Sequence, residues 1–269
     1  MPELPEVQTV VDTLAPTLVG RRLGAFLRLR RDMVSPSEVN LENLIPNRRV
    51  QAIWRRAKRI IFELDDGGRW FVHLGMSGRL TIEPEHAPVR KHTHLILDCG
   101  DGLQLRLVDP RRFGGIFWLG RGPVDERLGP EPFALRPQLL LRRLRLTRRP
   151  IKTALLDQRL IAGLGNIYAD EALFEAKIHP ATPADRISVA SARRLNAAIK
   201  RVLRRALRSR GSSLRDYVDA NGQPGDFRRL HRVYQRAGQQ CVTCGATIQR
   251  IVIGQRSTHY CPRCQSATA

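Results

Sequence analysis

The N-terminal hexapeptide Met1-Pro2-Glu3-Leu4-Pro5-Glu6 combines residue types that can carry out covalent chemistry. If Met1 is removed, the ring nitrogen of Pro2 becomes a free secondary amine, and a free α-amino group has a reference pKa near ~8, about two units below lysine. Such an amine can attack an electrophilic carbon and form an iminium, while the carboxyl group of Glu3 transfers protons. Because short motifs often mislead, the hexapeptide taken alone is better explained as an ordinary N-terminus, and the rest of the chain has to decide.

Four of the five cysteines lie near the C-terminus, in the pattern Cys241-x2-Cys244-x16-Cys261-x2-Cys264. Each Cys-x2-Cys turn directs two thiolates at one ion, so the two turns predict a tetrahedral, structural Zn²⁺ site with no open position. A redox role is the disfavoured alternative. Between the turns, residues 247–253 and 257–260 read as two strands, which predicts a β-hairpin with Arg256 at its tip. The fifth cysteine, Cys99, is most simply a small buried hydrophobe.

The charge balance predicts a polyanionic partner. The 269 residues contain 46 Lys and Arg against 25 Asp and Glu, a net charge of 46 − 25 = +21, and the sequence pI is about 11.3. Arginine supplies most of this excess, and its guanidinium suits bidentate phosphate contacts. An anionic membrane is the competing polyanion. No apolar run approaches the ~18 residues of a spanning helix and no secretory leader is visible, so we expect a soluble, intracellular nucleic-acid-binding protein.

A second group of candidate residues lies in and near the turn Gly163-Leu164-Gly165-Asn166. Backbone N–H groups at such a turn, with a helix dipole behind them, form a phosphate site, and Asn166 can cap the helix or donate to the phosphate. Lys152 is close enough in sequence to reach the same backbone. A tight structural turn explains the glycines equally well.

Two glycine-bounded loops carry the side chains best suited to filling a gap in a base stack. They are His73-Leu74-Gly75-Met76-Ser77-Gly78 and Asp109-Pro110-Arg111-Arg112-Phe113-Gly114. An enzyme that extracts a base from a duplex must fill the vacated space, and Met, Phe and Arg side chains can do so. Taken singly, Met76 and Phe113 are better explained by core packing.

The elements that position these residues change character along the chain. A helical apolar spacing over residues 3–18 is followed by eight short apolar stretches at 23–29, 50–54, 60–64, 70–74, 80–82, 94–99, 103–108 and 115–119, with glycine-rich hairpin turns at 65–68 and 100–102. This pattern predicts a β-sandwich or barrel-like domain. Helical spacing then predicts helices at 137–145, 151–156, 168–176 and 189–209. We therefore expect an α+β chain with three segments, 1–130, 131–234 and 235–269.

Together these segments resemble the bacterial formamidopyrimidine-DNA glycosylase family, also called MutM, within a wider group that includes endonuclease VIII. The resemblance covers nearly the whole chain, in the family's order. It is carried by the N-terminal hexapeptide, Arg55-Arg56-Ala57-Lys58, the two glycine-bounded loops, Ile161-Ala162-Gly163-Leu164-Gly165-Asn166-Ile167-Tyr168-Ala169-Asp170-Glu171 and the four-cysteine finger.

The resemblance implies roles for four residues in catalysis. Pro2 would be the nucleophile that attacks the sugar C1′ and forms a Schiff base, and Glu3 would be the proton donor. Lys58 would donate a proton in β-elimination. Arg256 would assist δ-elimination and hold a phosphate.

The resemblance also implies DNA contacts. Met76, Arg111 and Phe113 look like the trio that occupies the gap left by the flipped nucleotide, with Arg111 facing the orphaned cytosine. The phosphate-contacting positions would be His73, His92, Lys152 and Asn166. The loop 212–225 resembles the one that closes over 8-oxoguanine. At Gly225-Asp226-Phe227 the family more often has a bulkier aromatic in the middle position, which leaves the base preference open.

For the whole chain, the resemblance implies an N-terminal β-sandwich with flanking helices, a helix-two-turn-helix domain and a zinc-finger hairpin. The activity would be that of a bifunctional glycosylase and abasic-site lyase of base excision repair. Its substrate would be damaged duplex DNA, and it would act on oxidised purines as a cytoplasmic bacterial monomer with one structural Zn²⁺.

Two other interpretations stay open at this point. An endonuclease VIII-like enzyme would act on oxidised pyrimidines, although Leu4 and the two glycine-bounded loops look more like the formamidopyrimidine branch. A non-catalytic zinc-ribbon DNA-binding protein would fit the charge and the finger. It gives no reason for Pro2, Glu3, Lys58 and Arg256 to occur together.

Overall fold

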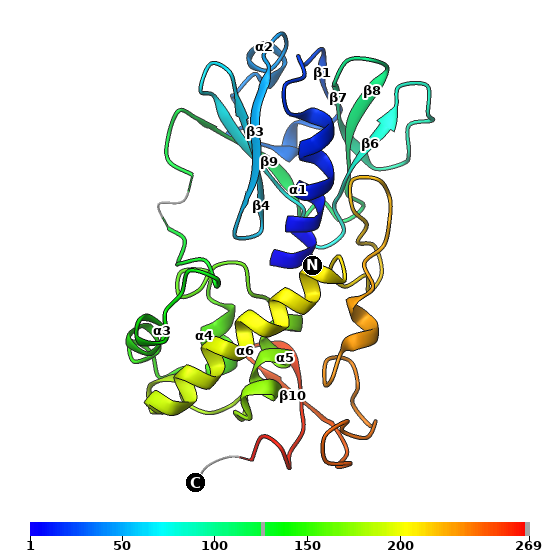
Figure 1. Ribbon diagram of the computed structural model, residues 1–269. Helices are drawn as coiled ribbons and strands as arrows, with labels where there is room; N and C mark the ends of the chain where they lie inside the picture. The colour runs from blue at the N-terminus through cyan, green and yellow to red at the C-terminus, as the bar shows by residue number, and fades with distance from the viewer. Residues whose placement is uncertain (125–126, 267–269) are drawn as a thin grey trace. The chain divides into compact units, whose positions relative to one another are not determined.

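The computed structural model describes residues 1–124 and 127–266 and divides the chain into two compact units (Figure 1). The first unit contains Met1–Glu126 and Ser209–Arg228, and the second contains Arg127–Arg208 and Arg229–Ala269. The grouping of residues 209–228 with the N-terminal part differs from the expected segments, which placed them with the helices.

The first unit is built on two β-sheets, as the strand pattern predicts. A five-stranded sheet has the order β2-β9-β5-β4-β3, and a four-stranded sheet has the order β1-β7-β8-β6. The strands are β1 (Phe26–Arg28), β2 (Val34–Ser35), β3 (Val50–Arg56), β4 (Arg59–Leu64), β5 (Arg69–His73), β6 (Arg79–Pro84), β7 (Thr93–Asp98), β8 (Leu103–Val108) and β9 (Gly115–Gly120). All pairings are antiparallel except β2 with β9.

Helix α1 (Leu4–Leu18) starts one residue after the predicted position and runs along β3 and β4 (Figure 1). Its apolar stripe, which includes Val7, Val10 and Leu14, is buried in the core shared with both sheets. Cys99 lies in the same core, as expected. Two short elements were not predicted, because β2 and helix α2 (Leu41–Leu44) are too short to show a periodicity; a 3₁₀ turn, η1 (Arg31–Met33), precedes β2.

Residues 209–228 belong to the first unit because they pack on α1 and the edge strand β6. Tyr217 and Ala220 are part of the N-terminal core. The Tyr217 hydroxyl donates to the carbonyl of Glu6 at 3.2 Å, and the Ala220 carbonyl accepts from the N–H of Ile82 at 2.9 Å. The loop 212–225 is therefore fastened to the helix that begins at Leu4.

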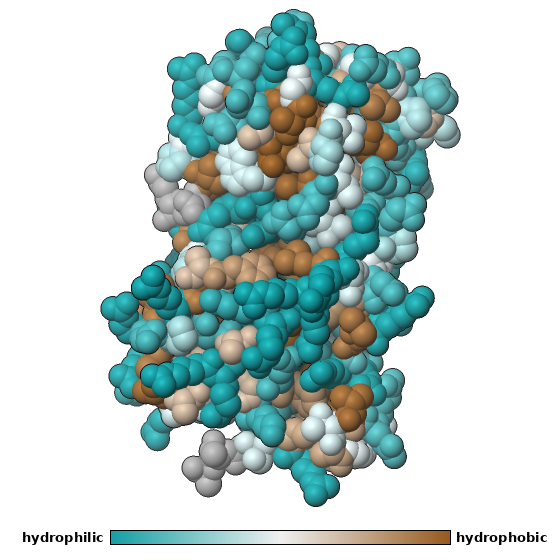
Figure 2. All heavy atoms as spheres, viewed as in Figure 1, coloured by the Kyte–Doolittle hydropathy of each residue, from teal (hydrophilic) through white to brown (hydrophobic). Residues whose placement is uncertain are grey.

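The second unit contains the helices and the finger. Its elements are α3 (Pro137–Leu144), α4 (Ile151–Leu156), α5 (Asn166–Ala176), η2 (Ala184–Arg186), α6 (Val189–Arg208), η3 (Phe227–Leu230, shared with the first unit), β10 (Gln249–Ile253) and β11 (Arg256–Tyr260). Helix α5 packs against α6 and β11. The outward side of α6 carries exposed arginines, among them Arg193, Arg201 and Arg204, and is hydrophilic in Figure 2. Burial of the opposite, apolar stripe explains its strong helical period.

Among the described residues, no helix is both long enough and apolar enough to cross a membrane.

Candidate active site and nucleic-acid interface

The N-terminal Pro2 and Glu3 are buried at the start of α1, where Glu3 is the N-cap residue and only 2% exposed. Glu3 and Glu6 form a reciprocal capping box, in which the Glu3 N–H donates to Glu6 Oε2 at 2.8 Å. This arrangement satisfies backbone groups that a helix start leaves unpaired. It also fixes the direction in which the chain enters the helix, and so the place of Pro2.

Glu6 has a second role that the sequence did not indicate. Its other carboxylate oxygen, Oε1, accepts from the N–H of Ser212 at 2.7 Å. Gly211 adopts a φ of +79°, and a Cβ there would lie 2.8 Å from the same oxygen. One buried carboxylate therefore joins the N-terminal residues to the base of the loop 212–225.

Lys58 lies at the tip of the β3–β4 hairpin and is buried, with 7% of its surface exposed. The preceding Ala57 adopts a φ of +55°, the left-handed conformation that a tight hairpin requires. Arg55 fastens this tip to α1, because its Nε donates to Gln8 Oε1 at 2.9 Å and its Nη1 donates to the Ala57 carbonyl at 2.9 Å. Pro2, Glu3 and Lys58 are thus all carried by α1 and the hairpin that is bonded to it.

His73, at the end of β5, is held as a neutral imidazole. Burial, together with the nearby cations Lys58 and Arg59, lowers the pKa of His73 to about 4. Its Nδ1 accepts the N–H of Gly75 at 3.0 Å, so the proton of the neutral ring is on Nε2. That Nε2–H is the donor available for the phosphate contact expected of His73.

The lowered pKa predicts a specific pH dependence of stability. Because the folded-state pKa lies below the ordinary value of 6.5, the unfolded state binds the proton more readily. The contribution of His73 is therefore fully present above pH 6.5 and is lost as the pH falls towards about 4, by roughly 1–3 kcal/mol. Urea denaturation of the wild type and His73→Gln at pH 7.5 and pH 5 should show a smaller pH-dependent loss in the variant. Equal losses would contradict the neutral state of His73.

The side chains predicted to fill the base stack are exposed, and the simpler expectation of core packing is wrong for both apolar ones. Met76 is 39% exposed and Phe113 is 57% exposed. Arg111 is also exposed, with its guanidinium carbon 4.8 Å from the centre of the Phe113 ring. His92 is exposed with a φ of +67°, and its carbonyl accepts the N–H of Asp109 at 3.0 Å. The first unit therefore presents all four side chains from connected loops.

Lys152 differs from expectation. Its side chain is fully buried, ion-paired with Asp170, with Thr258 Oγ1 at 3.4 Å from its Nζ. Asp170 in turn accepts the backbone N–H of His259 at 2.9 Å. A direct phosphate contact would require this pair to open, so the placement instead makes Lys152 a residue that holds α5 against β11 of the finger.

Asn166 also differs in part. Gly165 is the N-cap of α5, and Asn166 is the first helical residue, without a side-chain cap. Its amide Nδ2 donates to the Ser257 carbonyl at 3.0 Å. Asn166 therefore links the start of α5 to the residue that follows Arg256.

Arg256 is exposed at the tip of the finger, where Gly254 and Gln255 form the turn between β10 and β11. Both turn residues have positive φ values, of +54° and +61°. A Cβ on Gly254 would lie 3.0 Å from Thr153 Oγ1. The tip is therefore seated on α4, beside Lys152, which restricts where Arg256 can point.

The four predicted metal ligands, Cys241, Cys244, Cys261 and Cys264, converge. Their Sγ atoms all lie within 4.8 Å of one another, with 3.9 Å between Cys241 and Cys264 and 3.5 Å between Cys244 and Cys261. A tetrahedral zinc with Zn–S bonds of about 2.3 Å requires S–S separations of about 3.8 Å. Backbone N–H groups donate to the sulfurs of Cys241 and Cys261 at 3.4 Å, which favours thiolates. The donor set thus fits one structural Zn²⁺ with no open position.

Loss of one ligand should remove the metal and leave the sandwich folded. Cys244→Ser is expected to lose its zinc and most of its DNA affinity, whereas the first unit keeps its own core and unfolds separately. Metal analysis, DNA binding and near-ultraviolet circular dichroism would measure the three effects. Cys99→Ala is the matched control and should keep zinc, since Cys99 lies in the N-terminal core. Global unfolding of Cys244→Ser would contradict the prediction.

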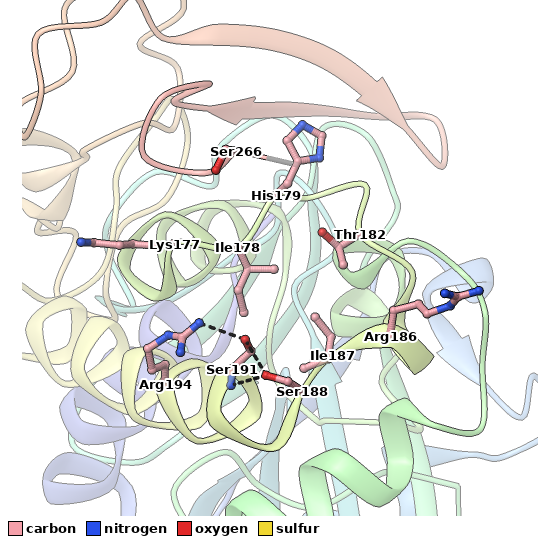
Figure 3. A pocket seen from close by; sticks show the side chains of 10 residues that line it. All are labelled: Lys177, Ile178, His179, Thr182, Arg186, Ile187, Ser188, Ser191, Arg194 and Ser266. Atoms are coloured by element: carbon pink, nitrogen blue, oxygen red, sulfur yellow. Dashed lines mark hydrogen bonds between the residues drawn. The ribbon is translucent and has the colours of Figure 1, made fainter. Parts of the chain in front are cut away.

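A cavity of about 250 Å³ in the second unit contains none of the predicted site residues (Figure 3). Lys177, Arg186 and Arg194 line it together with Ser188 and Ser191. Arg194 Nη2 donates to Ser191 Oγ at 2.9 Å and Ser188 Oγ donates to the same oxygen at 3.0 Å, so these three side chains bond to one another.

Comparison with known proteins gives one consistent result along the chain. Residues 1–116 match the formamidopyrimidine-DNA glycosylase N-terminal domain, residues 128–218 its H2TH domain, and residues 238–267 the zinc finger found in FPG and IleRS. The formamidopyrimidine-DNA glycosylase of Chloroflexus aurantiacus is 46% identical over 272 residues, covering 98% of each chain.

Solved structures agree. The MutM (Fpg) protein of Thermus thermophilus superimposes with a TM-score of 0.89 at 39% identity, covering 100% of both chains. The Lactococcus lactis Fpg in complex with abasic-site DNA gives a TM-score of 0.92 at 36% identity, covering 98% of this chain and 100% of that one. On these matches, together with the convergent cysteines and the buried N-terminal residues, the chain belongs to the formamidopyrimidine-DNA glycosylase family.

Proposed function

We propose that this chain removes oxidised purines from damaged duplex DNA and then cleaves the strand, with the Pro2 amine as nucleophile. The protein is a formamidopyrimidine-DNA glycosylase with abasic-site lyase activity that binds damaged duplex DNA and carries one structural Zn²⁺. The observation that supports the residue roles is the placement of Pro2 and Glu3 at the start of α1, with the Lys58 hairpin bonded to the same helix through Arg55.

The first step forms the covalent intermediate. The lone pair of the Pro2 nitrogen forms a bond to C1′ of the damaged nucleotide. The glycosidic bond breaks with its electron pair on the departing base, the Pro2 nitrogen loses the proton that it carried, and the base takes up one proton. Glu3 then donates a proton to the sugar ring oxygen as the ring opens, which leaves an iminium between C1′ and Pro2. Because Met1-Pro2 is an amide, this step requires a chain from which Met1 has been removed.

The iminium makes strand cleavage possible. It acidifies the C2′ hydrogen, so loss of that proton expels the 3′ phosphate by β-elimination, and a second loss at C4′ expels the 5′ phosphate by δ-elimination. Lys58 supplies a proton in the first elimination, and Arg256 assists the second from the finger tip. A glycosylase that used water alone would stop at the abasic site.

The exposed side chains of the first unit contact the DNA from which the damaged nucleotide is flipped out. Met76, Arg111 and Phe113 fill the gap in the stack, while His73 and His92 donate to phosphates. Unstacking and unpairing a nucleotide costs a few kcal/mol, and phosphate contacts from a basic surface offset that cost. Asn166 contacts a phosphate from the start of α5. Lys152 contributes to DNA binding indirectly, because its ion pair with Asp170 holds α5 against the finger.

Sodium borohydride trapping tests this assignment directly. A preparation shown by mass spectrometry to begin at Pro2 should give a covalent adduct with an 8-oxoguanine·cytosine duplex, and peptide mapping should find the adduct on Pro2. Adduct formation through a lysine, or none at all, would reject the mechanism.

A comparison of processing rates on duplexes with different lesions tests the substrate class. We propose that 8-oxoguanine and formamidopyrimidine duplexes are processed faster than thymine glycol duplexes, because the two glycine-bounded loops resemble the purine-specific branch. The opposite order would favour an endonuclease VIII-like specificity. We place this activity in the bacterial cytoplasm, on nucleoid DNA, and expect the monomer to be the active form.

A further inference from the structure

Asp109, a residue with no part in the mechanism above, lies under the loops that carry the exposed trio. Its side chain is fully buried, and its carboxylate accepts three hydrogen bonds. Oδ1 accepts from Ser77 Oγ at 2.5 Å and from the Arg111 N–H at 3.2 Å, and Oδ2 accepts from the Gly114 N–H at 2.8 Å. One carboxylate thus bonds the loop after β5 to both ends of the loop before β9.

The backbone of Asp109 joins two further residues to this centre. Its carbonyl accepts from His94 Nε2 at 2.8 Å, and its N–H donates to the His92 carbonyl at 3.0 Å. Ser77 also accepts the Arg111 N–H, at 3.2 Å, so the hydroxyl and the carboxylate share a donor. The loop that carries His92 is therefore tied to the same point as the other two.

Glycines bring the two glycine-bounded loops into backbone contact. A Cβ on Gly75, whose φ is +59°, would lie 2.3 Å from Gly114 N and 2.3 Å from the Phe113 carbonyl carbon. A Cβ on Gly114 would lie 2.5 Å from the His73 carbonyl oxygen. Because backbone atoms cannot yield as a flexible side chain can, neither loop can shift without displacing the other.

The buried Asp109 carboxylate is therefore bonded to the loops that carry the exposed side chains of Met76, Arg111 and Phe113. Met76 precedes Ser77, and Arg111 and Phe113 lie between Asp109 and Gly114. The anchoring atoms are therefore close in sequence to each side chain that enters the base stack. A displacement of these side chains of the order of ~1 Å is enough to disturb a reaction that depends on orientation.

We infer that Asp109 is a positioning residue, which sets the relative placement of Met76, Arg111 and Phe113 and thereby the selectivity for the base opposite the lesion. This inference rests on the proposed function. Its physical basis is that direct readout of a base edge by an arginine depends on a fixed geometry, and a well-placed pair discriminates by about 1–3 kcal/mol. Asp109 holds the backbone N–H of that arginine.

Asp109→Asn is the most informative variant, because it keeps the size of the side chain and removes one acceptor. A carboxylate offers two acceptor oxygens, whereas an amide offers one oxygen and one NH₂ group. In the variant, the NH₂ must face either the Gly114 N–H or the Arg111 N–H, whereas the Ser77 hydroxyl can rotate to accept. Two donors then oppose each other in a buried place, and one loop has to move.

The experiment compares 8-oxoguanine excision opposite cytosine and opposite adenine, under single-turnover conditions, in full-length protein beginning at Pro2. Asp109→Asn should reduce the cytosine-to-adenine rate ratio by about tenfold, since a misplaced arginine loses its discrimination. Borohydride trapping on a pre-formed abasic site should fall less than excision, because no base has to be extruded there.

Asp98→Asn is the matched control. Asp98 lies in the same unit and accepts a turn N–H, that of Gly100, at 2.8 Å, but it lies at the far end of β7 from this centre. Its replacement also removes a carboxylate acceptor and should lower the melting temperature while leaving the cytosine-to-adenine ratio at the wild-type value.

The melting temperature and the cytosine-to-adenine ratio together distinguish a positioning role of Asp109 from a merely structural one. If Asp109→Asn lowers the melting temperature but keeps the wild-type ratio, Asp109 is merely structural and the inference is rejected. Should that variant fail to fold, Ser77→Ala, which removes one donor and leaves the carboxylate, must shift the ratio in the same direction, and an unchanged ratio rejects the inference. If the wild type itself traps no abasic site, the proposed function fails instead.

Discussion

Glu3→Gln is expected to lower 8-oxoguanine excision by about 10²–10⁴-fold, the range that a positioned proton donor contributes. The glutamine oxygen can still accept in the capping box at the start of α1, so the free energy of unfolding should change by less than about 1 kcal/mol. Single-turnover excision and urea denaturation, both with chains that begin at Pro2, measure the two effects.

Glu6→Gln is the matched comparison, because it makes the same chemical change one helical turn away. Glu6 uses both carboxylate oxygens, one for the Glu3 N–H and one for the Ser212 N–H. An amide cannot accept both, so this variant should lose about 1–3 kcal/mol of stability. If Glu3→Gln stays within about threefold of wild-type excision, far below the usual contribution of general acid catalysis, Glu3 is not the proton donor.

Lys152→Met should have the largest effect on stability. Both members of the Lys152–Asp170 pair are fully buried, so removal of the lysine leaves an uncompensated carboxylate and costs about 3–5 kcal/mol. Lys152→Met combined with Asp170→Asn should recover much of that loss, because the neutral amide carries no charge and can still accept the His259 N–H. Lys200→Met, on the half-exposed side of α6, is the control and should change stability by at most about 0.5 kcal/mol.

The salt dependence of DNA binding separates this structural role from a phosphate contact. A lysine that contacts a phosphate contributes a slope of about 0.9 to the dependence of log K on log salt. If Lys152 acts through the finger, Lys152→Met should weaken binding with an unchanged slope. A slope reduced by about 0.9, with unchanged stability, would restore the direct phosphate contact.

The β-sandwich could be predicted because its strands have few residues between them and strong turn signals. Asp65-Asp66-Gly67-Gly68 and Gly100-Asp101-Gly102 mark hairpins whose flanking strands are in the predicted places. The finger was equally predictable, since its cysteine spacing reports on a shared ion. Short elements such as β2 and α2 could not be predicted, because two to four residues carry no period.

The surroundings of the individual side chains at the site could not be predicted from the sequence. The sequence marks Lys152 as a cation, but only the fold shows that Asp170 and Thr258 enclose it. The capping box of Glu3 and Glu6 was not predicted, because Glu3 stands where the usual signature has Ser or Thr. The bond from Glu6 to Ser212 joins residues far apart in the chain. Asp109 begins the motif Asp109-Pro110-Arg111-Arg112-Phe113-Gly114, but the sequence does not show that its carboxylate is buried.

The burial of Pro2 has a consequence for how the enzyme matures. Met1 is 47% exposed, but Pro2 and Glu3 are buried and the helix begins at Leu4, so the peptide bond before Pro2 has little free chain behind it. An aminopeptidase must draw the first residues into its own cleft in an extended form. We therefore expect Met1 to be removed from the nascent chain, before this helix docks. If Pro2 is the nucleophile, as we propose, a molecule that folds with Met1 in place should be inactive, and later exposure to the peptidase should not rescue it.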